Sequence, residues 1–581
     1  MELNSASTVA NLGIPLSGAR LLNKFYVQNV PLKDITVFDL NDLFKNLHGG
    51  KAPGLDRLDY KAYADDLALI LCASSRKNLE LSVNSALDLL CEKLSRLNLR
   101  VASEKTLAVV FRGTQNKNKQ KRGLATLKRP PIFKINNETI RTVDSLKYLG
   151  VIIDNRFSWT DHIDFLRSKM LNLIKNFISV SGPNWGVGAS LLKHWYLSVI
   201  QPSILYGSAV WGGSFTVKNI NSLFSIQRLA LLKISKSYRT CPTNALNVFL
   251  GIPPLHVVAK GLYIKFQIWK LRRNGFDFID INNLDKFIEI NNIELKYRVL
   301  DFSSTVVNSD FEVYTDGSGI DGNIGASVCI FNNNNCINVF KFKLSNFNSV
   351  FQAELAAINF AAGWALDNNV RINIFTDSLS SIEALKKSNS KSKYLNDIKN
   401  NMFGAIGSVG LSWVKAHAGI PGNELADQYA KDAAVNGNFL SMPAPYSYLK
   451  KFIKKFILDN WQQHWEDSKS GSRVREFVPH VDYDLLTHNR YFLFFISGHG
   501  PFPAYLHRFN ILESPNCVCG GLGDPDHFAF ECPLTSSFHF VKPTSLNKPL
   551  WFSNILKNKN SLVRFEQICR VTRKICDDFV V

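Results

Sequence analysis

The order of strand-like and helix-like segments in one stretch of about 130 residues constrains the fold of this chain more than any other sequence feature. Residues 311–319, 325–331 and 337–344 are rich in β-branched and aromatic residues and predict three strands. A Gly-Asn pair at Gly322 and Asn323 predicts a hairpin turn between the first two. Three consecutive strands of this kind predict the start of a β-sheet.

Helix-like and strand-like segments alternate after these three strands. Residues 351–366 are alanine-rich, with apolar residues at helical spacing. A strand at 371–378, a helix at 379–387, a strand at 409–417 and a helix at 422–434 follow. This order predicts a mixed α/β sheet with flanking helices.

The length and charge of the chain point to several domains and a polyanionic partner. The chain has 581 residues, and single hydrophobic cores rarely organise so many. Its formal net charge is +20, and lysine and arginine gain affinity for phosphates by displacing counterions. Solubility alone is the other reading of this charge, and nucleic acid is the favoured one.

The sequence predicts an intracellular protein, in the nucleus or the cytoplasm, that does not enter a membrane. The first residues lack the basic start and apolar core of a secretory signal. The apolar run at 491–497 is too short to cross a bilayer. Ten cysteines are scattered without the rhythm of a disulfide scaffold, which favours a reducing compartment.

Four carboxylates in the 308–436 stretch occupy unusual positions. Asp316 lies inside the first strand, Glu354 on an apolar helix face, Asp377 at a strand end and Asp427 in the first turns of the last helix. A carboxylate in apolar surroundings is costly unless it is paired or binds a metal. Any one of them alone is more simply a surface or capping residue. Together, in this element order, they predict a site for two divalent ions, such as the sites that hydrolyse phosphodiesters.

The stretch resembles the ribonuclease H family in four motifs. These are TDGS at 315–318, AEL at 353–355, TDS at 376–378 and HAGIPGNELAD at 417–427. The last is similar to the family signature His-x-Gly-x-x-Gly-Asn-x-x-Ala-Asp at every fixed position. The resemblance implies an endonuclease that cuts the RNA strand of RNA–DNA hybrids.

The resemblance also implies roles for individual residues. Asp316, Glu354, Asp377 and Asp427 would bind two Mg²⁺ or Mn²⁺ ions, and His417 would shuttle a proton near the leaving group. Contacts to the hybrid are implied for Gly317, Ser318, Gln352 and Asn423. Gln352 departs from the family pattern, because it lies one place closer to the glutamate than the family's glutamine.

An upstream segment resembles the palm of a reverse transcriptase. YADD at 63–66 is similar to the hairpin that carries catalytic carboxylates, and 143–159 is similar to the following hairpin of Jockey-type non-LTR retrotransposon enzymes. KAPGLD at 51–56 resembles a finger motif, yet YADD follows it almost at once. The palm strand that carries another metal-binding Asp is therefore missing, through a deletion or an error in the gene model.

We expect from this gap that the chain does not polymerise DNA. Asp65 and Asp66 would then be relics of a polymerase site. Loss of a central palm strand should leave exposed apolar edges, with aggregation or partial disorder before about residue 150.

A Cys/His cluster near the C-terminus has the composition of a zinc site. Cys517, Cys519, His527 and Cys532 have the spacing Cys-x-Cys, seven residues, His, four residues, Cys. Three thiolates and one imidazole suit tetrahedral Zn²⁺, and the alternative is a set of buried, metal-free cysteines. The segment resembles the tail of Jockey-type polyproteins, which implies a structural or nucleic-acid-binding zinc module.

The fold class is therefore multidomain α/β: a ribonuclease H-like mixed sheet, preceded by an incomplete reverse-transcriptase palm and thumb and followed by helices with a small zinc module. We expect these segments: unassigned 1–35, fingers and palm remnant 36–155, thumb-like helices 156–300, ribonuclease H 308–436, helical linker 437–510, CCHC zinc knuckle-like module 511–535 and tail 536–581.

Two alternatives to the ribonuclease remain open. A catalytically decayed nucleic-acid-binding protein would bind tightly, in a salt-sensitive manner, without turnover. A polymerase completed by a partner chain would extend primers only in a mixture with that partner.

Overall fold

The computed structural model describes residues 19–26, 58–63, 66–73, 75–96, 98–111, 130–180, 182, 185–484 and 489–579. The finger motif at 51–56 and Asp65 lie outside these residues. The chain forms two compact units, one from 264–456 and the other from 1–263 together with 457–581. Helices α11 (Leu255–Trp269) and α17 (Tyr446–Glu466) each run from one unit into the other.

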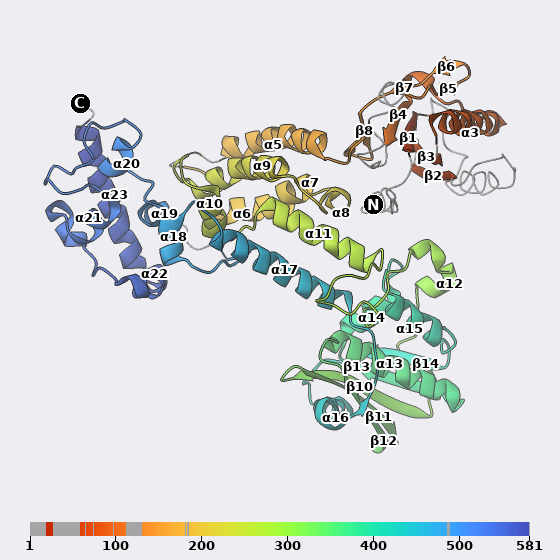
Figure 1. Cartoon of the computed structure of the whole chain (residues 1–581). Coiled ribbons are helices and arrows are strands. Elements are labelled where there is room, and N and C mark those ends of the chain that lie inside the picture. Colours follow the sequence, from red (N-terminus) through yellow and green to blue (C-terminus); the bar gives the residue numbers. More distant parts are fainter. Residues whose placement is uncertain are drawn as a thin grey trace. The chain divides into compact units, whose positions relative to one another are not determined.

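The 264–456 unit is built on a mixed six-stranded sheet, in the order β14-β13-β10-β11-β12-β15 (Figure 1). β10 pairs antiparallel with β11, and β11 with β12, whereas β13 and β14 run parallel to β10. The strands are β10 (Phe311–Ile320), β11 (Asn323–Asn332), β12 (Asn335–Leu344), β13 (Ile372–Thr376), β14 (Val409–Trp413) and β15 (Asn438–Phe439).

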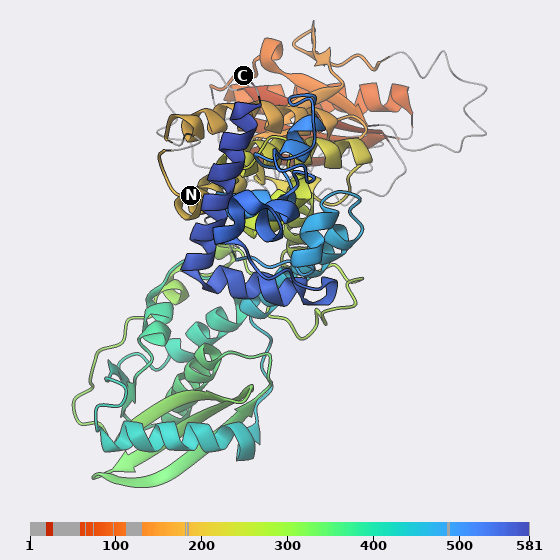
Figure 2. The ribbon, with the colours of Figure 1, turned by 90° about the vertical axis from the view of Figure 1, so that its left-hand side faces the viewer.

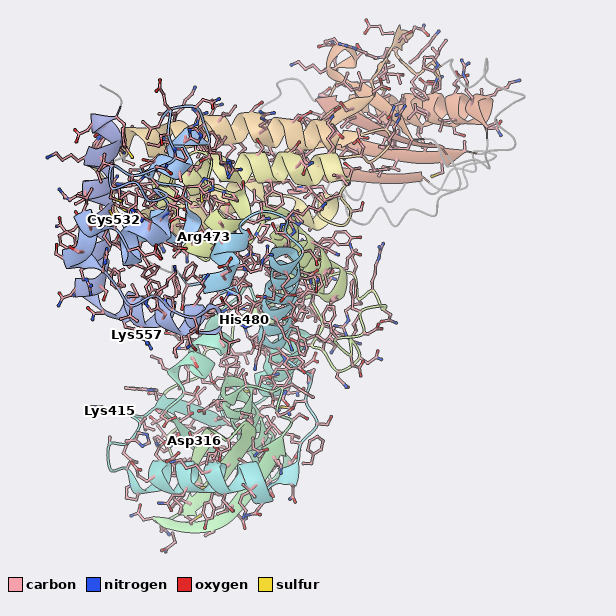
Figure 3. All side chains as sticks on the ribbon, turned by 60° about the vertical axis from the view of Figure 1, so that its left-hand side comes forward. Asp316, Lys415, Arg473, His480, Cys532 and Lys557 are labelled. Atoms are coloured by element: carbon pink, nitrogen blue, oxygen red, sulfur yellow. The ribbon has the colours of Figure 1, made fainter. Side chains whose placement is uncertain are left out.

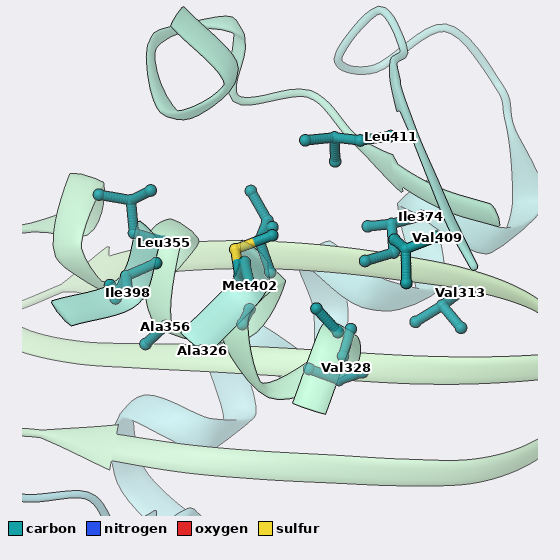
Figure 4. Close-up of a cluster of buried hydrophobic side chains, with 14 of the residues drawn as sticks. Val313, Ala326, Val328, Leu355, Ala356, Ile374, Ile398, Met402, Val409 and Leu411 are labelled. Carbon is teal, nitrogen blue, oxygen red and sulfur yellow. The ribbon is translucent and has the colours of Figure 1, made fainter. Parts of the chain in front are cut away.

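Helices cover both faces of this sheet. The helices of the two layers lie on opposite faces of the sheet (Figure 2). Alternate residues of β11 explain this: Val328 (Figure 4) and Ile330 join the core with α13, and Cys329 and Phe331 pack with Ala426 of α16. The helices are α13 (Val350–Asp367), α14 (Leu379–Lys386), α15 (Lys393–Phe403) and α16 (Pro421–Asn436).

The sheet and helices expected from the sequence are present, with three differences, the first being the unexpected short strand β15. The hairpin turn is Asp321–Gly322 rather than Gly322–Asn323, because both residues have positive φ and Ile320 pairs with Asn323. Helix α15 was not expected; Ser392 caps it by accepting a hydrogen bond from the Leu395 amide.

The compact unit also extends beyond the expected boundaries of 308–436. Leu300 and Phe302 before the sheet and Met442 after it lie buried in the same core. The Asp285 amide donates to the Ala444 carbonyl at 2.9 Å, which ties the two flanking segments together.

The other unit contains a five-stranded sheet in the order β2-β3-β1-β4-β7, which we call the palm-like sheet because it includes the segment expected to resemble a palm. Strand β1 pairs antiparallel with β3 on one side and β4 on the other. It comes from the segment left unassigned, so the gap that we expected to expose apolar edges is filled from the N-terminal side. The elements are β1 (Ala19–Tyr26), β2 (Leu58–Tyr63), β3 (Asp66–Ala73), β4 (Leu107–Phe111), β7 (Arg141–Thr142) and α3 (Arg76–Arg96), which packs on β3.

The remainder of this unit is mainly helical. A short antiparallel hairpin precedes it, made of β8 (Ser145–Tyr148) and β9 (Val151–Asp154). Helix α5 (Thr160–Val180) packs on α9 (Val217–Ser235), and α9 on α10 (Thr243–Leu250). Within the described ranges no single helix is both long and apolar enough to span a bilayer, although α10 with α11, bent by 63°, meets the same length and composition test as a pair.

The C-terminal segments share one aromatic core. Phe565 packs on Phe495 with ring centroids 4.7 Å apart and on Phe540 at 4.4 Å. Phe530, in the expected zinc module, also packs on Phe495 with centroids 6.1 Å apart, so this module and the tail are parts of one folded body. Its helices are α18 (Ser472–Phe477), α19 (Arg490–Ser497), α20 (Pro503–His507), α21 (Pro525–Phe530), α22 (Lys548–Lys557) and α23 (Lys559–Asp578).

Candidate active site

Asp316 lies buried in the central strand β10 of the mixed sheet (Figure 3). Strand β13 runs parallel to β10 beside it, and Thr376 of β13 is paired with Thr315 of β10. The next residues along these parallel strands are Asp316 and Asp377, so adjacent strands bring two carboxylates to the same end of the sheet.

Glu354 reaches the same place from helix α13. The helix begins with a capping box, in which the Ser349 side chain accepts from the Gln352 amide and the Gln352 side chain accepts from the Ser349 amide. A side chain at Gly317 would place its Cβ 2.8 Å from the Glu354 nitrogen. The glycine after Asp316 therefore permits the close approach of helix to strand that sets Glu354 beside Asp316.

Asp377 is held by two neighbours. The Asn423 side-chain amide donates to its Oδ2 at 3.2 Å, and the Trp413 indole donates to its backbone carbonyl at 3.0 Å. The Asn423 side chain is itself buried. Asn423 thus orients Asp377 from the first turn of α16.

Asp316, Glu354 and Asp377 offer ligand oxygens that all lie within 4.8 Å of one another. Burial, followed by the charges of Asp377 and Asp427, raises the pKa of Asp316 to about 7. Burial, followed by the charges of Asp316 and Asp377, raises the pKa of Glu354 to about 9. Glu354 Oε2 is buried without a hydrogen-bond partner. Crowded acidic oxygens of this kind fit a site for hard divalent cations.

Asp427 belongs to an adjacent group with His417 and Glu424, whose ligand atoms also lie within 4.8 Å of one another. Lys431 Nζ pairs with Asp427 Oδ2 at 2.6 Å. Three of the four expected carboxylates therefore form one cluster. Asp427 lies outside this cluster but close enough that its charge raises the pKa of Asp316. Glu424 was not singled out from the sequence, although it stands inside the signature string.

His417 lies on the loop between β14 and α16. Its side chain is 75 % exposed, and its Nδ1 is 4.0 Å from Glu424 Oε2. Its φ of 53° is the left-handed conformation, which fixes an unusual path for the loop. The His417 imidazole is therefore accessible from solvent while it lies next to Glu424.

The four residues expected to contact the hybrid come from three elements. Gly317, which is buried, and Ser318, which is half-buried, lie on β10 directly after Asp316, and the buried Asn423 lies in the first turn of α16. Gln352 is also buried, and its side chain bonds to Ser349, Asn348 and the Pro443 carbonyl. The structure therefore places Gln352 as a helix-capping residue at the start of α13.

The Cys/His cluster forms a second candidate metal site. The ligand atoms of Cys517, Cys519, His527 and Cys532 all lie within 4.8 Å of one another (Figure 3). Cys532 Sγ is 3.8 Å from Cys517 Sγ and 3.9 Å from Cys519 Sγ, and Cys519 Sγ is 3.2 Å from His527 Nε2. A Zn–S bond of about 2.3 Å gives tetrahedral sulfur–sulfur edges of about 3.8 Å. The four residues therefore fit Zn²⁺.

In the palm-like sheet, the described strands include Asp59 in β2 and Asp66 in β3. Asp66 begins β3, and β3 pairs with β1 along its length. The eight residues of β1, ARLLNKFY, include no Asp or Glu. The strand that occupies the place between β3 and β4 therefore supplies no carboxylate.

Comparisons with known proteins agree with the geometry of the 264–456 unit. The family model for RNase H matches residues 308–435. A retrovirus-related Pol polyprotein from the type-1 retrotransposable element R1 of Nasonia vitripennis is 28% identical over 194 residues, which cover 33% of this chain and 56% of that protein. An RNA-directed DNA polymerase from the mobile element jockey of Drosophila melanogaster is 22% identical over 193 residues, 33% of this chain and 20% of that protein.

Among solved structures, RNase H1 from Halobacterium salinarum NRC-1 is similar at 16% identity and a TM-score of 0.18, covering 21% of this chain and 96% of that one. The matched part spans about half the length of the Nasonia relative and about a fifth of the jockey protein.

Proposed function

We propose that this chain, which carries an RNase H domain and is homologous to R1 and jockey Pol polyproteins, cleaves the RNA strand of RNA–DNA hybrids. The reaction is hydrolysis of a phosphodiester with the help of two Mg²⁺ or Mn²⁺ ions. The observation that carries the proposal is the convergence of Asp316, Glu354 and Asp377, with one Glu354 oxygen buried and unpartnered.

The four carboxylates have distinct tasks in this proposal. Asp316, Glu354 and Asp377 hold the ions, and Asp427 completes the set from α16. Two such ions supply an activated nucleophile and relieve charge on the leaving oxygen. Asn423 keeps Asp377 in its orientation through the 3.2 Å hydrogen bond.

His417 acts on the proton of the leaving group. Its exposure and its place beside Glu424 allow the imidazole to approach the scissile phosphate and withdraw. A histidine suits this task because its ordinary pKa lies near neutral pH. Ser318, two residues after Asp316, presents its backbone to the substrate, whereas the buried Gly317 permits the close approach of α13.

The test is the variant Asp377→Asn in the full chain. Mg²⁺-dependent cleavage of a labelled hybrid should fall about a hundredfold or more, because one ligand charge is lost. Asp367→Asn is the matched control, since Asp367 is exposed at the far end of α13. Cleavage that is equal in the two variants would refute the proposed site.

A nucleic-acid-binding role without turnover is the second candidate. The burial of Gln352 favours it, because a side chain that the resemblance assigns to the substrate is occupied elsewhere. This candidate predicts salt-sensitive binding of the hybrid and no cleavage by the unmodified chain, in Mg²⁺ or in Mn²⁺.

We also propose that the polymerase is inactive. A polymerase site needs carboxylates on neighbouring palm strands, and β1 brings none to the side of Asp66. Asp65 and Asp66 remain as relics in this account.

The cysteines also bear on where the chain is located. All ten are free of disulfides, which suits an intracellular location in the nucleus or the cytoplasm.

A further part of the proposal is that Cys517, Cys519, His527 and Cys532 bind one Zn²⁺ that stabilises the C-terminal body. Purified protein should release one zinc per chain on denaturation, and Cys532→Ser should lose it. Cys336→Ser, at an exposed cysteine, is the control. Equal zinc content in both variants would contradict the site.

A further inference from the structure

The loop from Lys236 to Pro242, which joins α9 to α10, lies against the C-terminal body. Both belong to the same compact unit. Thr240 bonds through its hydroxyl to His499 Nδ1 at 2.9 Å and also to the Tyr505 hydroxyl. Segments separated by about 260 residues in the sequence therefore form one continuous surface.

Aromatic rings line this junction. The Tyr238 ring contacts Phe494 and Tyr505 edge-on, with centroids 5.1 Å and 5.5 Å apart. Tyr505 lies 5.2 Å from His499 and 5.2 Å from Phe509. Phe509, at the end of this series, is 41% exposed, so its ring is accessible to a ligand.

Arginine side chains lie near these aromatic rings. The Arg508 guanidinium lies 5.9 Å from the centre of the Phe509 ring, and Arg573 of α23 donates to the Tyr238 hydroxyl at 3.2 Å. Arg239, Arg508 and Arg573 are exposed. Burial, followed by the charges of Arg508 and Arg228, lowers the pKa of His499 to about 4. The imidazole is therefore neutral at pH 7 beside an excess of positive charge.

Basic residues outnumber acidic ones on the nearby helix α23, five to three. Glu566 pairs with Arg570 at 2.7 Å, one turn before Arg573. Asp577 lies one turn after Arg573, and the charges of both act on Cys576. Three exposed arginines therefore come from three separate segments around the aromatic junction, with Arg508 next to the Phe509 ring.

We propose that this surface, formed by Tyr238, Arg239, Tyr505, Arg508, Phe509 and Arg573, binds single-stranded nucleic acid. Arginines on both sides follow the phosphates, and Phe509 stacks on a base, which duplexes do not expose. The surface lies in the unit that does not contain Asp316, so it acts independently of hydrolysis.

The experiment measures binding of fluorescent dT20 and U20 to the full chain by anisotropy, in Mg²⁺ and 0.1 M salt. A ribonuclease H does not cut either strand, so failure of the proposed cleavage leaves this test intact. The first variant is Arg508→Glu with Arg573→Glu. Its matched control is Lys557→Glu with Lys559→Glu, two exposed lysines of the same body, and α22, with Lys557, lies at the opposite end of that body from α20 (Figure 1).

We expect the arginine variant to weaken binding about 20-fold, since each lost phosphate contact weakens binding about fivefold at this salt concentration. The lysine control should keep affinity within about twofold. Phe509→Ala, at an exposed position that should not affect folding, should weaken binding about tenfold. A preference for dT20 or U20 would show which sugar the surface favours, and either result supports it.

Two outcomes would overturn the proposal. Equal losses in the arginine variant and the lysine control would show that only overall charge matters. An unchanged affinity of Phe509→Ala, together with equal binding of duplex DNA, would show that no base stacks on this surface.

Discussion

The two sheets of this chain differ in how their strands place acidic residues. In the 264–456 unit, Asp316 lies within β10, Asp377 directly follows the adjacent parallel strand β13, and Glu354 lies on helix α13, so that one ligand oxygen from each lies within 4.8 Å of the others. In the palm-like sheet, Asp66 begins a strand whose neighbour β1 has no acidic residue. An acidic sequence motif therefore forms a metal site only where neighbouring elements of the fold supply further carboxylates.

This difference extends to how the missing strand is replaced. Strand β1 restores the hydrogen bonding between β3 and β4, which satisfies the backbone. Its eight residues include no Asp or Glu, so on the proposal that the polymerase is inactive β1 completes the sheet without adding a carboxylate.

The sharpest way to break this comparison is to assay both reactions with the same preparation. We expect no primer extension on an RNA template with deoxynucleotides and Mg²⁺, because the palm-like sheet lacks a carboxylate on β1. A full-length retrotransposon polymerase is the positive control. Extension by the isolated chain would show that the palm is complete.

Glu354→Gln should separate activity from stability. Hybrid cleavage should fall about a thousandfold, since a buried ligand is lost. The metal-free protein should unfold a few degrees higher, because the pKa of about 9 shows that burial opposes ionisation of Glu354. Differential scanning calorimetry without added divalent ions measures the second effect. A lower unfolding temperature would mean that the carboxylate is structural.

His417→Ala should reduce cleavage about a hundredfold while binding of the hybrid is unchanged, as expected for loss of proton transfer. His480→Ala, an exposed histidine of the other unit, should have no effect on either (Figure 3). The role of His417 is wrong if its variant binds the hybrid weakly but cleaves bound hybrid at the normal rate.

Gly317→Ala should slow cleavage about tenfold, because the new methyl group would lie 2.8 Å from the Glu354 nitrogen and displace α13. Gly363→Ala on the same helix meets open space and should instead stabilise the unit by roughly 0.5–1 kcal/mol. Steady-state cleavage and thermal unfolding of the two variants distinguish these effects. Normal cleavage by Gly317→Ala would show that the close approach is unnecessary.

The smallest expected effect concerns pH. Burial, with His464 and Lys260 nearby, lowers the pKa of His256 to about 4, so the unfolded chain binds the proton more readily. Stability is full above pH 6.5 and is lost as the pH falls toward 4, by about 1–2 kcal/mol at pH 5. His256→Gln should lose less stability between pH 7 and pH 5 than the unmodified chain. Parallel unfolding curves for both would contradict this prediction.

The parts predictable from sequence were those governed by local pattern. Strand alternation, helical spacing and the string HAGIPGNELAD identified the sheet, its helices and the carboxylates of the site. Helix α15 was not predicted because its buried apolar residues, such as Ile398, are interrupted by polar residues that include the buried Lys399.

Long-range contacts explain the remaining differences. Nothing in ARLLNKFY shows that it inserts between β3 and β4, because strand pairing at such separation depends on the whole sheet. The burial of Gln352 follows from its bond to the Pro443 carbonyl, about 90 residues away. The surface around Phe509 likewise exists only where the α9–α10 loop meets the C-terminal body.

The most direct test of the central claim incubates the full chain with a labelled RNA–DNA hybrid, duplex RNA and duplex DNA, each with Mg²⁺ and with a chelator. The account predicts Mg²⁺-dependent loss of the RNA strand of the hybrid alone. Folded protein that leaves the hybrid intact in Mg²⁺ would contradict it and favour the binding protein without turnover.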